Sequence, residues 1–337
     1  MPLARRSLLA GAGALATATL LPACTGVRGG ALLAADTHPT GYPTVEAVRY
    51  MGRLLEERSD GRLRMELYSG STLGQEKDTL EIAIFGGIDI NRVNLAPLNS
   101  IVPETVVPGL PFIFDSVAHM RAAMDGAPGR RILDALEPHG LIGLCFYDSG
   151  SRSLYTTSRS IERPEDLAGL KIRVQSSDLF VAMIDALGGN PTPMDYGEVY
   201  QGLLQGAVDG AENNWPSYES TRHFEAARYY SLTRHVISPE VLTMSAQTYR
   251  RLSEGDRQLV REAARESVPV MRRLWDERVM RSRELVLAAG NTITEPDPAP
   301  FRARMEPVWD RFLTTPQLRQ LAGEIQAVTP LASGGAE

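Results

Sequence analysis

The 337-residue chain has only two cysteines, Cys24 and Cys145, and it lacks the short motifs of the common enzyme classes. It has no Gly-x-Ser-x-Gly elbow, His-Glu-x-x-His helix, Cys-x-x-Cys pair or phosphate-binding loop. Its five histidines are scattered, and no two of them have the spacing of metal ligands. We therefore predict a protein without catalytic residues, bound metal or cofactor.

Basic clusters are also missing beyond the first few residues, and the formal net charge is -6. A protein that binds nucleic acid needs positive charge to meet the phosphates, so we expect no nucleic-acid partner. A composition of 43% hydrophobic and 23% charged residues is ordinary for a soluble globular protein, and the length suffices for two domains.

A membrane-spanning run is missing as well, because the apolar stretch at residues 7–21 is shorter than the about 20 residues that cross a bilayer. Arg5 and Arg6 precede this stretch, and small residues follow it. This order is typical of an export signal, and the arginine pair fits a twin-arginine signal as well as an ordinary one. We therefore expect a periplasmic protein.

Two processing sites fit this signal. Leu21-Pro22-Ala23-Cys24 resembles a lipoprotein box, in which Cys24 would carry the lipid, although proline is unusual there. The alternative is ordinary cleavage near Ala34-Ala35. We favour it because the composition of residues 25–35 gives little sign of a folded segment, whereas the sequence pattern of a globular domain begins at Asp36. We assign residues 1–35 to the signal and a linker.

Helical and strand patterns alternate through the rest of the chain, with short loops between them. Helices are predicted at 43–59, 75–85, 119–136 with an interruption at 126–129, 177–187, 196–204, 253–289, 300–313 and 317–328; strands at 62–68, 88–95, 141–147, 170–175, 208–212 and 239–245; and polar loops at 148–153 and 213–218. This β-α-β order predicts an α/β fold with a largely parallel sheet. The 253–289 helix is unusually long, Pro269 is expected to kink it, and residues 331–337 are expected to be a disordered tail.

One stretch carries a candidate binding residue. Leu170, Ile172 and Val174 alternate with Lys171 and Arg173, so Arg173 projects from the polar face of a half-buried strand. Its planar guanidinium matches a carboxylate through two parallel hydrogen bonds. Arg173 is thus either a solvated strand residue or an anchor for an acidic ligand.

Several motifs in order resemble the solute-binding proteins of tripartite ATP-independent periplasmic (TRAP) transporters, of the DctP type, over about residues 36 to 328. They are Leu73-Gly74-Gln75 and Gly87-Ile88-Asp89, Pro164 to Val174 around Arg173, Pro191-Thr192-Pro193-Met194, and Val208-Asp209-Gly210-Ala211-Glu212-Asn213. The resemblance implies an α/β fold of two lobes, with a cleft that closes by hinge motion and a long helix along both lobes. It implies lobe I at 36–150 with 239–278, and lobe II at 151–238 with 279–330.

The resemblance also implies the binding residues. Arg173 falls on the arginine that pairs with a ligand carboxylate, and Arg152 on a second family arginine, which could instead brace the hinge against a carboxylate. The other implied contacts are Asn213 and Tyr196 in lobe II, and His38, Gln75 and Asn94 in lobe I. Trp215, an aromatic residue before Pro216 on an expected cleft loop, is either a core residue or stacks against the face of a sugar.

These candidates are mainly amides and aromatics beside one carboxylate anchor, which favours a hydroxylated monocarboxylate. The string from Glu212 to Tyr218 resembles the uronic-acid branch of the family, so we predict a hexuronate such as glucuronate or galacturonate. Another keto or hydroxy acid, or a role as a sensor subunit, is the alternative, and a periplasmic enzyme is less expected. The implied partners are the transporter's membrane subunits, and the protein itself is expected to be a monomer that needs no ATP.

Overall fold

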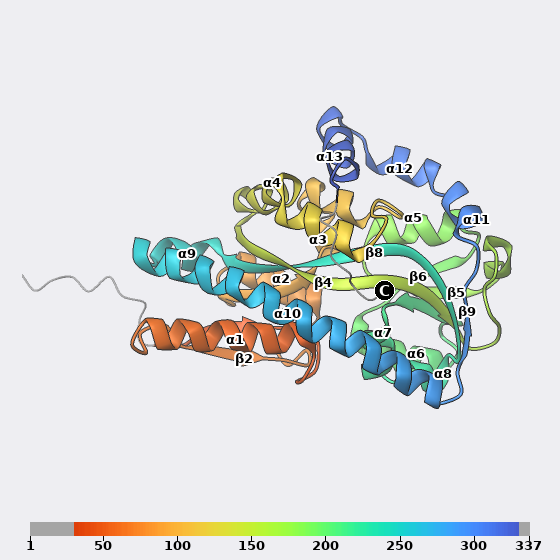
Figure 1. The fold of residues 1–337 in the computed structure, drawn as a ribbon, viewed down its shortest axis with the longest axis horizontal. Helices are drawn as coiled ribbons and strands as arrows, with labels where there is room; N and C mark the ends of the chain where they lie inside the picture. Colours follow the sequence, from red (N-terminus) through yellow and green to blue (C-terminus); the bar gives the residue numbers. More distant parts are fainter. Residues whose placement is uncertain (1–29, 330–337) are drawn as a thin grey trace, which may run out of the picture.

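The computed structural model describes residues 30–329, which form a nine-stranded sheet covered by helices (Figure 1). The export signal, Cys24 and the 331–337 tail lie outside the described residues. The strands are β1 (Leu32–Ala35), β2 (Met65–Tyr68), β3 (Ile90–Asn94), β4 (Leu141–Thr156), β5 (Lys171–Val174), β6 (Asn190–Pro193), β7 (Gly210–Asn213), β8 (Tyr229–Ser245) and β9 (Thr292–Thr294). Their order is β2-β1-β3-β8-β4-β7-β5-β6, with β9 on β8.

The sheet has two parallel ends joined by an antiparallel centre. β1 pairs in parallel with β2 and β3 at one end, and β5 pairs in parallel with β6 and β7 at the other. Between them β8 runs antiparallel to β3 and β4, and β4 antiparallel to β7. The prediction of a largely parallel sheet is therefore wrong for the centre of the sheet, where the long strands β4 and β8 connect the two parallel ends.

These two strands, β4 and β8, each belong to both lobes. The C-terminal part of β8 pairs with β3, whereas its first residues pair with β9. β4 pairs with β7 only at its C-terminal end, from Ser153 to Thr156, and its register with β8 shifts between Asp148 and Ser151 and between Arg152 and Leu154. The prediction of a polar loop at 148–153 is thus wrong. These residues belong to an irregular but continuous strand that crosses from one lobe to the other.

The expected boundary after residue 35 is also wrong, because β1 lies before it. Leu32, Ala34 and Ala35 are buried, and β1 holds a central place between β2 and β3. Leu32-Leu33-Ala34-Ala35 is apolar and directly follows other small residues, so its pattern resembles the end of an export signal. The strand is recognisable only from its partners.

Thirteen α-helices surround the described part of the sheet. They are α1 (Pro43–Arg58), α2 (Glu76–Ile84), α3 (Val117–Asp125), α4 (Ala127–Ala135), α5 (Asp178–Ala186), α6 (Val199–Leu204), α7 (Trp215–Ser220), α8 (His223–Ala226), α9 (Ala246–Arg251), α10 (Glu254–Ala288), α11 (Pro298–Ala303), α12 (Glu306–Phe312) and α13 (Pro316–Gln326). Two predictions need correction. The loop expected at 213–218 contains α7, which Asn214 caps, and the helix expected at 300–313 is divided into α11 and α12.

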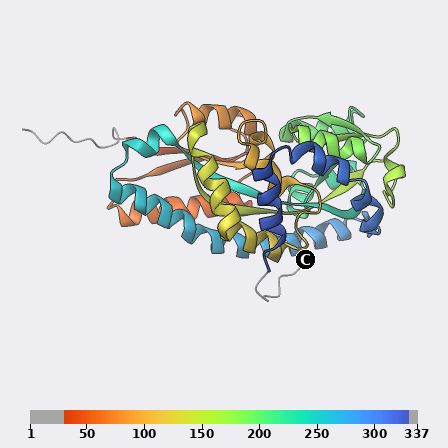
Figure 2. The same ribbon diagram turned by 90° about the horizontal axis from the view of Figure 1, so that it is seen from above.

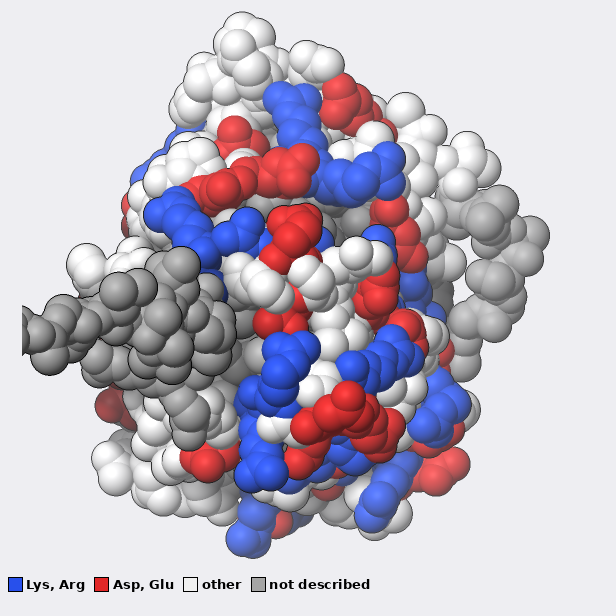
Figure 3. Space-filling model, turned by 90° about the vertical axis from the view of Figure 1, so that its left-hand side faces the viewer, with Lys and Arg blue, Asp and Glu red and all other residues white. Residues whose placement is uncertain are grey.

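Helix α10 links the lobes. The Ser253 hydroxyl caps it by accepting from the backbone N–H of Asp256, and the helix continues through Pro269. It contacts α1, β4 and α7, and in Figures 1 and 2 it runs along both halves of the molecule. Charges of both signs mingle on the end of the molecule where α9 lies (Figure 3). No helix among residues 30–329 has the length and hydropathy needed to cross a membrane.

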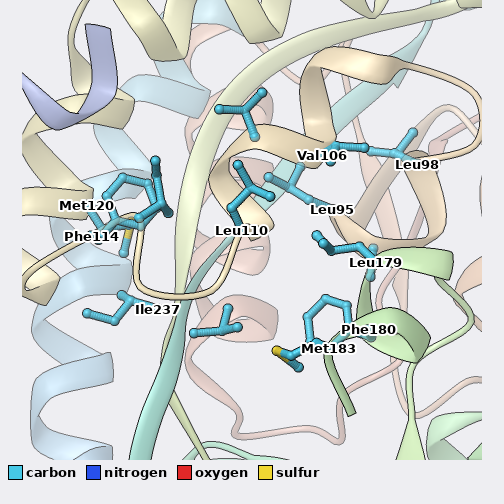
Figure 4. Packing of buried hydrophobic residues seen from close by; sticks show 14 of the residues in the cluster. Leu95, Leu98, Val106, Leu110, Phe114, Met120, Leu179, Phe180, Met183 and Ile237 are labelled. Carbon is cyan, nitrogen blue, oxygen red and sulfur yellow. The ribbon is translucent and has the colours of Figure 1, made fainter. Parts of the chain in front are cut away.

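A hydrophobic cluster continues from one lobe to the other. Leu179, Phe180 and Met183 of α5 belong to the same cluster as Leu98 and Leu110 from the loops after β3 (Figure 4). Beside them, the side-chain amide of Asn99 lies 2.8 Å from the hydroxyl of Ser177. The two lobes therefore touch, which is the arrangement of a closed cleft.

Candidate ligand-binding site

A small cavity, named here the interlobe cavity, lies between the lobes. It is lined by Thr37, His38, Glu76, Asn94, Ser149, Arg152, Arg173, Gln175, Tyr196, Asn213 and Ser217. Asn94 and Asn213 end β3 and β7, Arg173 and Gln175 lie at the end of β5, and Thr37 and His38 closely follow β1. Ligands of open α/β sheets bind beyond the carboxyl ends of parallel strands, and this cavity has that position.

Arg173 is a buried cation without a carboxylate partner. It is 3% exposed, and its Nε donates to the backbone carbonyl of Met194 at 2.9 Å. Within residues 30–329, no carboxylate lies within ion-pair distance of it, and neither terminal amino group has a hydrogen-bond acceptor. Burial lowers the pKa of its guanidinium. An uncompensated buried charge is costly, so this guanidinium is prepared for an anion.

Arg152, by contrast, is compensated within the protein. Its Nε and one terminal nitrogen donate to the two carboxylate oxygens of Glu212 at 2.6 and 2.7 Å, and the other donates to Asn213 at 3.0 Å. Burial alone would raise the pKa of Glu212, but the charge and hydrogen bonds of Arg152 and the nearby His235, whose Nε2 lies 3.7 Å from the carboxylate, lower it to about 2. Arg152 thus lines the cavity and also braces β4 against β7.

The lobe I wall rests on a second buried arginine. Arg92 is fully buried and pairs with Asp36, with Glu76 at 2.8 Å and with Glu240 at 3.3 Å. Burial would raise the pKa of Asp36, but the charge of Arg92 and the hydrogen bond with His38 hold it well below its usual range. This network fixes Asn94, whose Nδ2 lies 3.2 Å from the Glu240 carboxylate.

Aromatic rings close the same wall. His38 is buried, and its ring stacks on Tyr42 with 3.8 Å between the centroids. Nδ1 of His38 lies 3.2 Å from the carboxylate of Asp36, and its ring meets the edge of Tyr196 at 5.4 Å. A histidine from lobe I and a tyrosine from lobe II therefore touch at the cavity.

Several polar atoms in the cavity have no partner among residues 30–329. They include the hydroxyl of Tyr196 and both ends of the Gln175 amide, all of them buried. The side-chain oxygen of Asn213, Oδ1, accepts from Arg152 and from the backbone N–H of Asn214. The side-chain nitrogen of Asn213 is left without a protein acceptor in the described chain. Buried polar groups normally find partners, so these atoms suit the hydroxyls of a ligand.

Two predicted residues lie elsewhere. Trp215 lines a different, larger cavity and packs edge-on against Tyr230, because α7 begins at Trp215 and the alternation of β7 ends at Asn213. Gln75 precedes α2 and caps it, so its neighbour Glu76 takes the place in the cavity. Neither Trp215 nor Gln75 lines the interlobe cavity, and their contacts with a ligand stay a prediction.

The sequence analysis also missed lining residues, namely Thr37, Glu76, Ser149, Gln175 and Ser217. Gln175 could have been found, because it lies two residues beyond Arg173 and shares its side of the chain. Glu76 and Thr37 adjoin predicted residues. No sequence pattern indicated that Ser217 lines the cavity, because its position depends on the formation of α7. Among residues 30–329, no cluster of three or more metal-ligating side chains is present.

Comparison with known proteins agrees with the fold and the cavity. Residues 34–315 match the family model of bacterial extracellular solute-binding protein, family 7. A solute-binding protein of Chromohalobacter salexigens is 45% identical over 293 residues, which cover 86% of this chain and 87% of that protein.

Solved structures extend this similarity. A TRAP periplasmic solute-binding protein from Bradyrhizobium sp. BTAi1, in complex with D-galacturonate, is 51% identical and superposes with a TM-score of 0.87, covering 89% of this chain and all of that one (100%). One from Roseobacter denitrificans with bound β-D-glucuronate is 42% identical, with a TM-score of 0.87 and the same coverage of 89% and 100%. These matches confirm the predicted two-lobed fold and the predicted family. The chain therefore belongs to family 7 of the bacterial extracellular solute-binding proteins, the solute-binding components of TRAP transporters.

Proposed function

We propose that this protein captures a hexuronate, D-glucuronate or D-galacturonate, and presents it to the membrane subunits of a TRAP transporter. The observation that carries the proposal is the uncompensated guanidinium of Arg173, buried in the interlobe cavity. A carboxylate placed on its two terminal amino groups would satisfy both its charge and its donors.

The charges around the cavity support a monoanion. Arg152 is paired with Glu212, and Arg92 is paired with Asp36, Glu76 and Glu240. Arg173 is left as the single uncompensated arginine in the cavity lining that the structure describes. A second carboxylate on the ligand would meet Glu76 rather than another free cation, so dicarboxylates are expected to bind poorly.

The unpaired polar atoms of Gln175, Tyr196 and Asn213 support a ligand with several hydroxyls. Amides and phenols donate and accept, as sugar hydroxyls do, and each neutral hydrogen bond contributes about 1 kcal/mol net. Relatives with bound galacturonate and glucuronate make hexuronates the natural ligand class for this arrangement.

Binding is proposed to proceed by hinge closure about the irregular parts of β4 and β8. Lobe I would comprise β1, residues 36–150 and 239–278, and lobe II residues 151–238 and 279–330. Because Arg173 and Asn213 come from lobe II and His38 and Asn94 from lobe I, the full set of contacts forms only in the closed state.

The cellular setting is part of the same proposal. The protein would reach the periplasm through the signal that precedes β1, either as a soluble protein or lipidated at Cys24, and would act as a monomer. It would bind its ligand without turnover and need no ATP or cofactor. Recovery of chemically unchanged hexuronate after incubation with the protein tests this point, and a converted product would contradict it.

Thermal unfolding with a ligand panel tests the main proposal. D-glucuronate or D-galacturonate at about 100 times its Kd should raise the Tm by roughly 4 °C. Glucose lacks the carboxylate and glucarate carries a second one, so neither should match this rise. If no sugar acid in the panel changes the Tm, the proposal is wrong.

Variants at Arg173 identify the anchor. Removing one partner of a buried ion pair costs about 3 to 5 kcal/mol, so Arg173→Ala should weaken hexuronate binding about 100-fold or more. The unliganded variant should unfold no earlier than the wild type, because it no longer buries an unpaired charge. Arg250, which is exposed, provides the matched control Arg250→Ala, and its hexuronate affinity should not change.

A further inference from the structure

A second cavity, of about 230 Å³, lies on the opposite side of the hinge; we name it the hinge cavity. It lies against α10, the helix that crosses the front of the molecule in Figure 1. About half of its lining residues are apolar, among them Phe112, Phe114, Trp215, Leu232, Trp275 and Val279. A hollow of this size is large enough for a small organic molecule.

The two cavities share β4 as a common wall. Arg152 lines the interlobe cavity, whereas its neighbours Ser151 and Ser153 line the hinge cavity. Side chains alternate along a strand, so the two cavities lie on opposite faces of β4 where it crosses between the lobes. Asn213 and its neighbour Asn214 are divided between the cavities in the same way, at the end of β7.

The rim of the hinge cavity is positive. Among the described residues, Arg283 has no side-chain hydrogen bond or ion pair, and Arg302 lies over the ring of Phe112 at 4.8 Å without a carboxylate partner. Arg234 has only a long contact with Glu295, at 3.5 Å.

Two acidic residues also line the hinge cavity. Asp276 is engaged by Arg121 at 2.6 Å, and Asp115 is exposed, with His119 at 3.8 Å. Arg283 and Arg302 therefore remain available to an anion, while the aromatic wall favours a flat apolar body.

We propose that the hinge cavity is a binding site for an aromatic organic anion, and that its occupancy strengthens sugar-acid binding in the interlobe cavity. The first part stands on the walls and rim described above. The second part rests on the proposed function.

The reason for the coupling is that the walls of the hinge cavity come from both lobes and from α10. Phe114 precedes α3 in lobe I, and Arg302 lies in α11, which packs on β8. A ligand that fits this cavity holds its walls in the relative placement of the closed form, in which Tyr42 and Ser217 meet at 3.0 Å. By linkage, each ligand then strengthens the binding of the other.

The backbone at the hinge cavity supports a mechanical role. Gly150 has a φ of +62°, and a Cβ there would lie 2.8 Å from the ring of Trp275. Phe112 and Arg234 also have positive φ, 57° and 43°, and all three residues line the cavity. Glycine adopts a positive φ freely, but for Phe112 and Arg234 it is an unfavourable conformation that persists only where the surrounding structure holds it.

Fluorescence with 8-anilinonaphthalene-1-sulfonate, an aromatic anion, tests the site. One molecule per chain should bind and quench tryptophan emission, because two of the three tryptophans, Trp215 and Trp275, line the cavity. The uncharged analogue N-phenyl-1-naphthylamine should bind less tightly. Absence of saturable binding by the sulfonate would overturn the proposal.

Paired substitutions locate the site. Arg283→Gln with Arg302→Gln should weaken sulfonate binding about fivefold, the effect of two exposed charges, and leave the neutral analogue unaffected. The matched control is Arg250→Gln with Arg281→Gln, which removes two exposed arginines outside the cavity and should change neither affinity. Equal losses of sulfonate affinity in the two double variants would show that binding depends only on the overall positive charge, and would overturn the proposed site.

The coupling is tested separately. Arg173→Ala should bind the sulfonate as the wild type does, which excludes the interlobe cavity as its site. In the wild type, saturating sulfonate should lower the Kd of D-glucuronate about threefold or more, because each ligand favours the same closed form. An unchanged or raised Kd would overturn the coupling. If no hexuronate binds at all, the proposed function fails, but the sulfonate and Arg283/Arg302 measurements still decide the site.

Discussion

The hydroxyl oxygen of Tyr42 lies 3.0 Å from the hydroxyl oxygen of Ser217, and this contact joins α1 of lobe I to α7 of lobe II beside the interlobe cavity. Both residues are buried, and burial raises the pKa of Tyr42 well above its ordinary value, so the phenol remains neutral. Tyr42 also carries the stacked ring of His38. The contact therefore connects closure of the lobes directly to a wall of the cavity.

Tyr42→Phe should weaken this closure while keeping the stack. Loss of one neutral hydrogen bond costs about 1 kcal/mol, so the Kd of D-glucuronate should rise about fivefold, mainly through faster dissociation. Stopped-flow fluorescence measures the dissociation rate. Tyr68→Phe removes a hydroxyl that bonds only to Glu66 at the surface and should have no effect. Equal dissociation rates for Tyr42→Phe and the wild type would show that the contact does not hold the lobes closed.

Gln175 should contribute to sugar recognition rather than to stability. Both ends of its buried amide lack a partner among the described residues, so Gln175→Leu removes no hydrogen bond from the unliganded protein. We expect an unchanged or slightly raised Tm without ligand, and a D-glucuronate Kd about tenfold higher by calorimetry, as hydrogen bonds to hydroxyls are lost. Gln258→Leu, at an exposed site on α10, is the control. A lower Tm with unchanged affinity would assign Gln175 to folding instead.

The local patterns of the sequence predicted the elements of the fold better than their pairing. The strand around Arg173 and the long helix capped by Ser253 follow from short-range alternation, capping and periodicity, and both are present. The continuity of β4 through Asp148 and Arg152 could not be predicted, because its polar residues are buried only through partners on β7 and β8. The polar residues of this segment therefore predict a turn from local sequence alone, although pairing with distant strands makes the segment a strand.

The same distinction applies to the site. Arg173, Arg152, Asn213, Tyr196, His38 and Asn94 all line the interlobe cavity, as the family resemblance implied. The resemblance did not reveal that Arg152 is compensated and Arg173 is not, because that depends on which strand places Glu212 beside Arg152. Trp215 lies outside the interlobe cavity for a related reason: one change from strand to helix after Asn213 redirects its side chain.

Acid should destabilise the protein through the buried pair of Arg152 and Glu212. The folded pKa of Glu212 is about 2, against an ordinary value of 4.5, so the unfolded chain takes up the proton first. The resulting stability is fully present above about pH 5 and is lost as the pH falls toward 2, and its size is on the order of 3 kcal/mol.

Urea unfolding at pH 7, 5 and 4 measures this dependence. Replacing both partners, Arg152→Met with Glu212→Leu, should flatten the decline in unfolding free energy below pH 5. Replacing the exposed pair of Arg58 and Glu266 by Met and Gln should leave the decline much as it is in the wild type. An identical decline in all three proteins would exclude Glu212 as its source.

The buried strand β1 predicts where the folded protein can begin. Leu32 to Ala35 pair with β2 on one side and, through Ala34 and Ala35, with β3 on the other, and Asp36 directly after them pairs with the buried Arg92. A chain that starts at residue 36 would lose β1 and expose the edges of β2 and β3. Its charged amino terminus would be that of Asp36 itself, which pairs with the buried Arg92. We expect that chain to unfold well below the wild type or to aggregate, whereas a chain that starts at residue 25 should keep the full Tm and bind D-glucuronate normally. Equal melting temperatures for the two chains would show that β1 is dispensable and would restore cleavage near Ala34-Ala35 as a workable processing site.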